Sequence, residues 1–288
     1  MIFHTFLCVA VEMGVIMIKQ YENFNLKHIA ESGQCFRMNP LDEKSYGIVS
    51  YGKFLKLTQI EENIVDFDCT EDDFNNIWLD YFDLEYDYKS IVTKLQTEED
   101  EFLRNASEYG YGLRILKQEP FEALISFIIS QNKNIPAIKS SIEKLSKMYG
   151  EEIYVPGSDI IYYSFPSPEK LANASNEDLR KTGLGYRDEY IIRTSRAVAN
   201  GDIDLNALKN MGHKEAVEAL LTLHGVGIKV ANCASLYGLH HIDAFPIDTW
   251  IKRILNEIYD NKFDIKKYDG YAGIVQQYMF YYMRNRNN

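Results

Sequence analysis

The sequence of 288 residues has little cysteine and proline, with four and seven residues respectively, and it contains no long uninterrupted apolar run. The cysteines lie far apart, and no two of them have the spacing of metal ligands. So few cysteines in so long a chain argue against a disulfide framework. A reducing compartment, the cytoplasm, is therefore expected.

The apolar start of the chain also lacks the marks of a targeting segment. Residues 1–19 have no basic residue before Lys19, and Glu12 interrupts them. They lack the basic start of a signal peptide and the roughly 20 apolar residues of a membrane helix. We predict a first strand or helix here and no membrane partner. Met13 and Met17 also fit a native start 12–16 residues further on.

Basic residues are scarce relative to acidic ones, with 31 Lys and Arg against 42 Asp and Glu and a net charge of −11. Taken as one number, this charge argues against a nucleic-acid partner. The excess is local, however. Residues 61–100 contain 14 acidic residues and only two lysines, a net of −12, so the rest of the chain is close to neutral. The charge therefore does not exclude DNA binding by the remainder.

The apolar fraction of 46% and the charged fraction of 25% exclude a disordered chain, a collagen and a coiled coil. Residues 45–69 alternate apolar and polar side chains between turn residues, which predicts an antiparallel meander. In residues 71–87, apolar side chains recur every three to four positions. This spacing predicts a helix with a solvated acidic face.

Helical spacing dominates after about residue 100. Helices are expected to begin at Pro120 and Pro168. Further helices are expected over residues 175–182, 187–199, 213–223, 228–238, 248–259 and 270–283. The predicted fold class is α+β, with an N-terminal antiparallel sheet domain followed by a mostly helical bundle. We place the sheet domain and its acidic segment at residues 1–107 and the helical domain at residues 108–288.

The most informative segment is HKEAVEALLTLHGVGIKVANCASLYGL, residues 213–239. Gly225 and Gly227 surround Val226 in a break between two helices, which permits a tight turn with Val226 plugging the space between them. Free N–H groups at such a turn can bind a phosphate. A purely structural glycine turn is the alternative.

Two further residues stand near this turn in the sequence. Lys229 falls in the first turn of the second helix, and Asp248, in FPIDTW, stands where it can cap the next helix. Considered separately, they are also compatible with a solvated surface lysine and a plain helix cap. Together with the glycine turn, they resemble the helix-hairpin-helix glycosylase superfamily.

Five strings resemble those of the 8-oxoguanine DNA glycosylase/lyase family and occur in the order typical of it. Along the chain they are SGQCFR, ISFIISQNKNI, TGLGYR, LHGVGIKVANC and FPIDTW. The resemblance extends from about residue 31 to residue 280. It implies that Lys229 is the nucleophile and Asp248 its electrostatic partner. An unprotonated amine can displace a damaged base and leave a Schiff base, from which β-elimination nicks the strand. Asp248 would stabilise the cationic sugar.

The resemblance also implies a pocket for 8-oxoguanine. The Gly33 carbonyl would accept the ring N–H that distinguishes this lesion from guanine. Cys233, one helical turn after Lys229, would stack under the flipped base. Gln276 would read its pairing edge, and Phe280 would cover it from the same helix face. A turn glycine, a small core cysteine and a core aromatic are the structural alternatives for Gly33, Cys233 and Phe280.

For the opposite strand, the resemblance implies that Asn132 fills the gap left by the flipped base. Tyr186 would act as a wedge, and Arg187 would contact the estranged cytosine. Eukaryotic-type members have a second cytosine-reading arginine where this chain has Ala137, so we predict a weaker preference for cytosine. They also have a histidine where this chain has Trp250, which puts one phosphate contact in doubt.

Other members of the superfamily fit the sequence less well. Glycosylases for oxidised pyrimidines or adenine mispairs often carry an iron–sulfur cluster on four cysteines near the C-terminus, where this chain has Cys233 alone. An alkylbase glycosylase would lack Lys229. A non-catalytic helix-hairpin-helix module of a repair assembly is the alternative from another class.

The expected partner is duplex DNA containing 8-oxoguanine, bound by a monomeric protein in the nucleoid-associated cytoplasm. We expect no required cofactor and no catalytic metal. A structural monovalent cation or calcium is expected on the hairpin carbonyls near residues 223–226.

Overall fold

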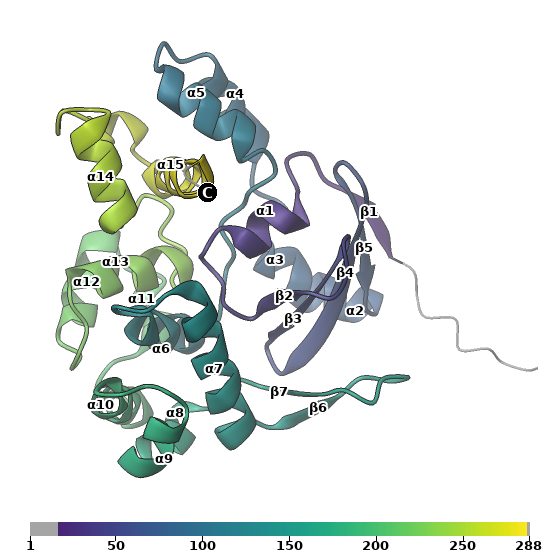
Figure 1. Ribbon diagram of the computed structural model, residues 1–288, viewed down its shortest axis with the longest axis vertical. Helices are drawn as coiled ribbons and strands as arrows, with labels where there is room; N and C mark the ends of the chain where they lie inside the picture. The colour runs from purple at the N-terminus through teal and green to yellow at the C-terminus, as the bar shows by residue number, and fades with distance from the viewer. Residues whose placement is uncertain (1–16, 287–288) are drawn as a thin grey trace, which may run out of the picture.

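The computed structural model describes residues 17–286. The element predicted at the start of the chain therefore lies, up to residue 16, outside the described residues, as does Cys8. Figure 1 shows a twisted sheet beside a larger helical body, with the C-terminal helix between α14 (Thr249–Glu257) and α1 (Leu26–Glu31). This arrangement confirms the predicted α+β fold.

Five short strands form one antiparallel sheet in the spatial order β1-β5-β4-β3-β2. They are β1 (Ile18–Gln20), β2 (Met38–Pro40), β3 (Ser45–Ser50), β4 (Lys53–Glu61) and β5 (Ile64–Asp68). The predicted meander corresponds to β3, β4 and β5. Its alternating pattern buries Leu55 and Leu57 of β4 and Val65 and Phe67 of β5 on one face. A separate hairpin of β6 (Glu152–Tyr154) and β7 (Ile161–Tyr163) projects from the helical part.

The N-terminal helical segments are α1 (Leu26–Glu31), α2 (Glu71–Asp73), the π-helical turn η1 (Phe74–Trp78), α3 (Leu79–Tyr81), α4 (Tyr88–Gln96) and α5 (Glu101–Tyr109). The middle of the chain forms α6 (Pro120–Ser130), α7 (Ile135–Tyr149), α8 (Pro168–Ala172), α9 (Asn176–Lys181), α10 (Arg187–Ala199) and α11 (Leu205–Leu208). The last third forms α12 (His213–Leu221), α13 (Ile228–Tyr237), α14 (Thr249–Glu257), the 3₁₀ turn η2 (Ile265–Tyr268) and α15 (Ala272–Arg286).

The predicted helix over residues 71–87 is wrong in its second half, because regular helix ends at Tyr81. Asp83 has a φ of +50°, a left-handed conformation that interrupts a helix. Its side chain is also not solvated: it is buried, accepts a hydrogen bond from Tyr88 at 3.0 Å and pairs with Lys117 at 3.0 Å. One carboxylate of the acidic segment, that of Asp83, is therefore buried in the interior and not solvated.

Two groups of buried apolar side chains form the core. The smaller group lies between the sheet and α1–α3, and the larger group fills the helical body. Helices α4 and α5 belong to the larger group, since α5 packs against α15. The two groups do not follow the order of the chain: Phe36, from the N-terminal part, belongs to the larger group, and Leu116, which follows α5, belongs to the smaller one. The division of the chain after residue 107 stays a prediction.

Candidate active site

The hairpin between α12 and α13 is a tight turn built on glycine. Gly225 has a φ of +81°, and a Cβ there would lie 2.3 Å from the Tyr190 ring, so only glycine fits. Val226 is buried between the helices, as predicted. Among residues 17–286, the N–H groups of Gly225 and Gly227 have no hydrogen-bond acceptor. They are therefore available to an anion at the start of α13.

Lys229 lies in the first turn of α13 and reaches back to the end of α6. Its Nζ donates to Ser130 Oγ at 3.3 Å, and the Ser130 hydroxyl donates to the Phe127 carbonyl at 2.8 Å. The Nζ also lies 5.6 Å from the centre of the Phe127 ring. Within the part of the chain that the structure describes, no ion pair joins Lys229 to a carboxylate. The amine is thus held in place by one weak polar contact.

Asp248 caps α14, as the sequence predicts. Its Oδ1 accepts from the Ile251 N–H at 2.9 Å. Burial raises the pKa of Asp248, while the hydrogen bond from Ile251 and the charge of Lys229 act in the opposite direction. The cap fixes one carboxylate oxygen and leaves the other facing the cavity that Lys229 also lines.

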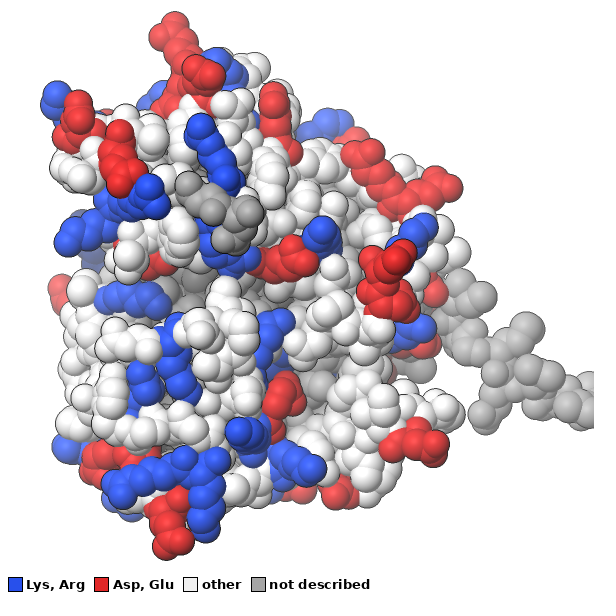
Figure 2. Space-filling view, viewed as in Figure 1, with Lys and Arg blue, Asp and Glu red and all other residues white. Residues whose placement is uncertain are grey.

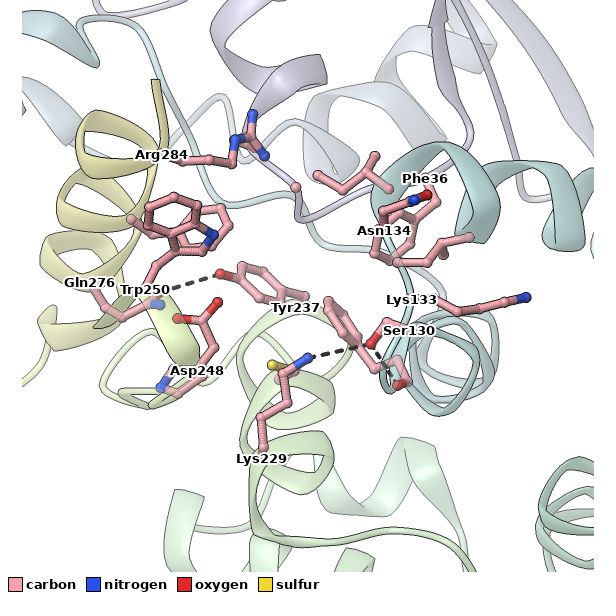
Figure 3. A pocket seen from close by; sticks show the side chains of 18 residues that line it. Phe36, Ser130, Lys133, Asn134, Lys229, Tyr237, Asp248, Trp250, Gln276 and Arg284 are labelled. Atoms are coloured by element: carbon pink, nitrogen blue, oxygen red, sulfur yellow. Dashed lines mark hydrogen bonds between the residues drawn. The ribbon is translucent and has the colours of Figure 1, made fainter. Parts of the chain in front are cut away.

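The cavity beside these two residues has a volume of about 320 Å³ and lies where α6, α7, α13, α14, α15 and the segment after α1 meet. Figure 3 shows Lys229 and Asp248 on one side of it and Arg284 on the opposite side. Gly33, Cys233, Gln276 and Phe280, the four residues assigned to base recognition, also line it. The structure therefore brings together all six residues predicted for catalysis and lesion binding.

A dense network of hydrogen bonds holds the backbone around Gly33. The Ser32 carbonyl accepts from Gln277 Nε2 at 2.7 Å, and the Gln34 carbonyl accepts from Gln118 Nε2 at 2.8 Å. Between them, the Gly33 carbonyl has no partner among residues 17–286. Gly33 itself has a φ of +79°. The peptide is thus rigid, and its one open acceptor is available to a ligand.

Helix α15 contributes one face to the cavity. Gln276 and Phe280 are four residues apart on it, as predicted, and Gln276 is almost fully buried. The Tyr237 hydroxyl lies 3.4 Å from Gln276 Oε1 and also contacts Gln277. The Gln276 amide nitrogen has no partner within residues 17–286, so it remains available to a ligand.

Cys233 is buried in the wall of the cavity, one turn after Lys229. Burial raises the pKa of its thiol to about 11, so the thiol is neutral at physiological pH. A neutral sulfur suits a flat apolar contact with a base and not the role of a nucleophile.

A second group of predicted residues, the opposite-strand cluster, comprises Asn132, Tyr186 and Arg187. Asn132 and Tyr186 are exposed, and Asn132 Nδ2 lies 3.4 Å from the Tyr186 hydroxyl. Arg187 is buried under the Tyr186 ring, 4.4 Å from its centre. Its guanidinium donates to the Leu184 carbonyl at 3.0 Å and to the Gln131 carbonyl, while its Nε is buried and has no partner in the described part of the chain.

Several cavity residues are absent from the sequence prediction: Ser130, Tyr237 and Arg284. Ser130 and Tyr237 gave no signal, because a serine at a helix end and a tyrosine in an apolar helix are common. Arg284 could have been found, since it continues the four-residue spacing of Gln276 and Phe280. Trp250, noted only for the missing histidine, also lines the cavity.

Two family models match successive parts of the chain. Residues 16–124 match the family model "8-oxoguanine DNA glycosylase, N-terminal domain", and residues 125–269 match "HhH-GPD superfamily base excision DNA repair protein". The chain belongs to the 8-oxoguanine DNA glycosylases of the HhH-GPD superfamily. The predicted family and the predicted class, a DNA repair enzyme, are thereby confirmed.

Individual relatives support the same assignment. The chain is 34% identical over 232 residues to the "Probable N-glycosylase/DNA lyase" of Methanothermobacter thermautotrophicus, covering 70% of this chain and 72% of that one. It is 32% identical over 264 residues to the Saccharomyces cerevisiae N-glycosylase/DNA lyase, covering 81% and 68%. The solved structure of Clostridium acetobutylicum 8-oxoguanine glycosylase/lyase, with double-stranded DNA containing cytosine opposite the lesion, is 35% identical with a TM-score of 0.87. That match covers 95% of this chain and 98% of the other.

The hairpin of this glycosylase offers only backbone oxygens to a cation. The carbonyls of Leu223, His224 and Gly225 already accept hydrogen bonds from Val226 N, Thr194 Oγ1 and Gln131 Nε2. Each carbonyl keeps a second lone pair, which suits a monovalent cation or calcium. Within residues 17–286, no group of three or more His, Cys, Asp and Glu side chains could hold a metal. The hairpin cation stays a prediction.

The acidic segment lies away from the candidate site. Residues 61–100 contribute β5, α2, α3 and α4, and none of the side chains lining the cavity comes from them. Figure 2 shows Lys and Arg side chains spread over the helical part of one face, interspersed with acidic groups, and further acidic groups at its upper edge and beside the sheet. Separately, none of the helices in the described range combines the length and the apolarity that a membrane crossing requires.

Proposed function

We propose that this protein flips 8-oxoguanine out of duplex DNA, excises it through a Schiff base on Lys229 and nicks the resulting site by β-elimination. The observation that carries the proposal is the position of Lys229. Its amine has no carboxylate partner within residues 17–286 and lines the same cavity as Asp248 and the open Gly33 carbonyl. Relatives named N-glycosylase/DNA lyase support this activity.

The proposed chemistry assigns one task to each residue. The neutral amine attacks C1′ of the deoxyribose, and the bond to the base breaks with its electrons leaving on the base, which takes up a proton. The amine then loses a proton as the sugar opens to a Schiff base. Asp248 stabilises the positive charge that develops on the sugar. Loss of a C2′ proton expels the 3′ phosphate and cuts the strand.

Lesion recognition follows from the cavity walls. The Gly33 carbonyl accepts the N7–H of 8-oxoguanine, which guanine does not have. The base stacks between Cys233 and Phe280, and Gln276 binds its pairing edge. Because guanine would leave the Gly33 carbonyl unpaired in a buried site, it is rejected.

The opposite strand is read less strongly in this proposal. Ala137 cannot replace an arginine, and two of the Arg187 donors, Nη1 and Nη2, already bind backbone carbonyls. We therefore expect a weaker preference for cytosine opposite the lesion. A monomeric state and a place in the nucleoid-associated cytoplasm also stay predictions; light scattering with and without DNA tests the former.

Borohydride trapping on an 8-oxoguanine duplex tests the mechanism. The native chain is expected to form a covalent adduct, and Lys229→Gln to form none, with a loss of excision of at least about 10³-fold. Lys252→Gln is the matched control, because Lys252 lines the neighbouring groove together with Lys229. Failure of the native protein to trap would exclude lyase chemistry, and trapping by Lys229→Gln would move the nucleophile elsewhere.

A further inference from the structure

Arg284 is a charged residue in the wall of the lesion cavity to which the proposed mechanism gives no task. It lies on α15 four residues after Phe280 and eight after Gln276, on the same helix face. Its guanidinium carbon lies 5.4 Å from the centre of the Phe280 ring. The side chain therefore extends the base-binding face of this helix.

The two terminal nitrogens of Arg284 differ in their surroundings. Nη2 donates to the Glu31 carbonyl, which anchors the guanidinium at the end of α1. Nη1 is buried and has no hydrogen-bond partner within residues 17–286. Leaving a buried donor of a charged group unpaired is costly, so a ligand atom is expected to complete it.

The position of Nη1 identifies which part of a ligand it would meet. It lies 3.2 Å from the place that a Cβ on Gly33 would occupy, and Phe280 Cε1 lies at the same distance. The unpaired donor is therefore next to Gly33, the residue whose carbonyl has no partner among residues 17–286.

We propose that Arg284 Nη1 donates a hydrogen bond to an exocyclic oxygen of the flipped base, beside the N7–H that the Gly33 carbonyl accepts. This inference rests on the proposed function. In 8-oxoguanine, N7–H is flanked by O6 and O8, so the base presents acceptor, donor and acceptor in a row. The Gly33 carbonyl complements the middle group, and Arg284 complements one of its neighbours.

The two contacts make different distinctions. Gly33 separates the lesion from guanine, because only the lesion has N7–H. A contact of Arg284 with O6 would separate guanine-derived lesions from adenine-derived ones, which have an amino group at that position. A contact with O8 would instead favour any 8-oxopurine. Arg284 is thus assigned as a specificity-determining residue.

Single-turnover cleavage by the full chain tests this assignment on duplexes with 8-oxoguanine, 8-oxoadenine or a preformed abasic site. Arg284→Met is expected to slow excision of 8-oxoguanine roughly 10- to 100-fold, the value of a hydrogen bond from a charged donor. Cleavage of the abasic site should not change, because no base is present. Arg284→Lys retains a cation and should lose less than Arg284→Met.

Arg286→Met is the matched control, since Arg286 is exposed on the same helix and lies over the Tyr282 ring instead. Loss on 8-oxoguanine alone supports a contact with O6, and loss on both lesions supports O8. Unchanged excision by Arg284→Met would overturn the inference. An equal loss on abasic DNA would also overturn it and place Arg284 on the sugar–phosphate backbone or in a structural role.

Two further comparisons separate a folding failure, and a failure of the proposed function, from the loss of the Arg284 contact. If Arg284→Met does not fold, Arg284→Lys provides the same comparison between lesion and abasic DNA. If the native chain does not excise 8-oxoguanine, the proposed function fails first. If it does excise the lesion and Arg284→Met matches it, only the role of Arg284 is lost.

Discussion

The lesion cavity and the opposite-strand cluster, Asn132, Tyr186 and Arg187, are built in different ways. Buried side chains and a clamped backbone form the cavity, where the Gly33 carbonyl and Arg284 Nη1 have no partner among the residues that the structure describes. In the cluster, two members are exposed and the guanidinium of the third binds backbone carbonyls. Among residues 17–286, the cavity thus holds an open acceptor and an open terminal donor, whereas Arg187 uses both terminal nitrogens on backbone carbonyls and keeps only its Nε unpaired.

This difference indicates which of the two regions distinguishes its ligand more strictly. A preformed acceptor or donor distinguishes ligands because a wrong partner leaves it unpaired. Arg187 would have to give up a backbone contact before it could bind a base, which reduces the net gain. We therefore expect strict reading of the lesion and tolerant reading of the base opposite.

After the loss expected for Lys229→Gln, the largest loss of excision is expected for a change at Asp248, which also lines the cavity. Asp248→Asn should slow base release by about 10²- to 10³-fold, irrespective of the opposite base, because the developing positive charge loses its counter-charge. Asparagine is also a good helix cap, so α14 and DNA binding should survive. Single-turnover kinetics measure the rate of base release, and thermal unfolding measures the stability of the variant. A loss of stability that matches the loss of rate would attribute the slower release to a damaged helix cap.

The pH dependence of the same step provides an independent check. Because burial raises the pKa of Asp248, its ionised form is lost at a higher pH than that of an exposed aspartate. Excision should therefore fall on the acid side of the profile above the ordinary aspartate range. Asp248→Asn should lack this limb, and an identical limb in the variant would assign it to another group.

The next largest loss of excision is expected for a substitution of Gly33. In Gly33→Ala, the φ of +79° would be strained and the new Cβ would meet Phe280 and Arg284 at 3.2 Å. Excision of 8-oxoguanine should fall by roughly 5- to 150-fold, from a strain of about 1–3 kcal/mol at the Gly33 carbonyl. Cleavage of abasic DNA should persist. Gly157→Ala is the control, with a φ of +76° and nothing within 4 Å; equal losses in both variants would attribute the effect to backbone strain alone.

At the opposite-strand cluster, a substitution is expected to increase the preference for cytosine opposite the lesion. Ala137→Arg adds a donor near Asn132 and should raise the ratio of excision opposite cytosine to that opposite adenine by roughly 5- to 100-fold, for a contact of about 1–3 kcal/mol. Ala137→Met controls for size without charge. A native preference for cytosine as steep as ~100-fold would contradict the tolerant reading.

The smallest effect is expected in the salt dependence of DNA binding. Since the hairpin offers backbone N–H groups to phosphates and the helical part is close to neutral, few counterions should be released. A plot of log affinity against log salt should be shallow. A slope equivalent to ~8 or more Lys or Arg phosphate contacts would show that side-chain charge dominates both strands.

Local features were predictable from sequence, and contacts across the chain were not. Residues 187–199 form α10 with the predicted bounds, and the glycine turn and the Asp248 cap have local signals. The helix predicted over residues 71–87 failed because apolar spacing does not reveal that Asp83 is buried. Ser130 and Tyr237 were missed because helical periodicity identifies a buried face without identifying its neighbour. Family resemblance supplied Gly33 and Gln276, which no pattern would have selected.

The two amide hydrogen bonds that flank Gly33 come from different parts of the molecule. Gln277 extends from α15, and Gln118 from the segment that leads into α6, whereas Lys229 depends on neither of them. Warming that loosens these clamps would move the Gly33 carbonyl and leave Lys229 in place. Fidelity should therefore fail at a lower temperature than strand cleavage, and a partly loosened enzyme would begin to remove undamaged guanine.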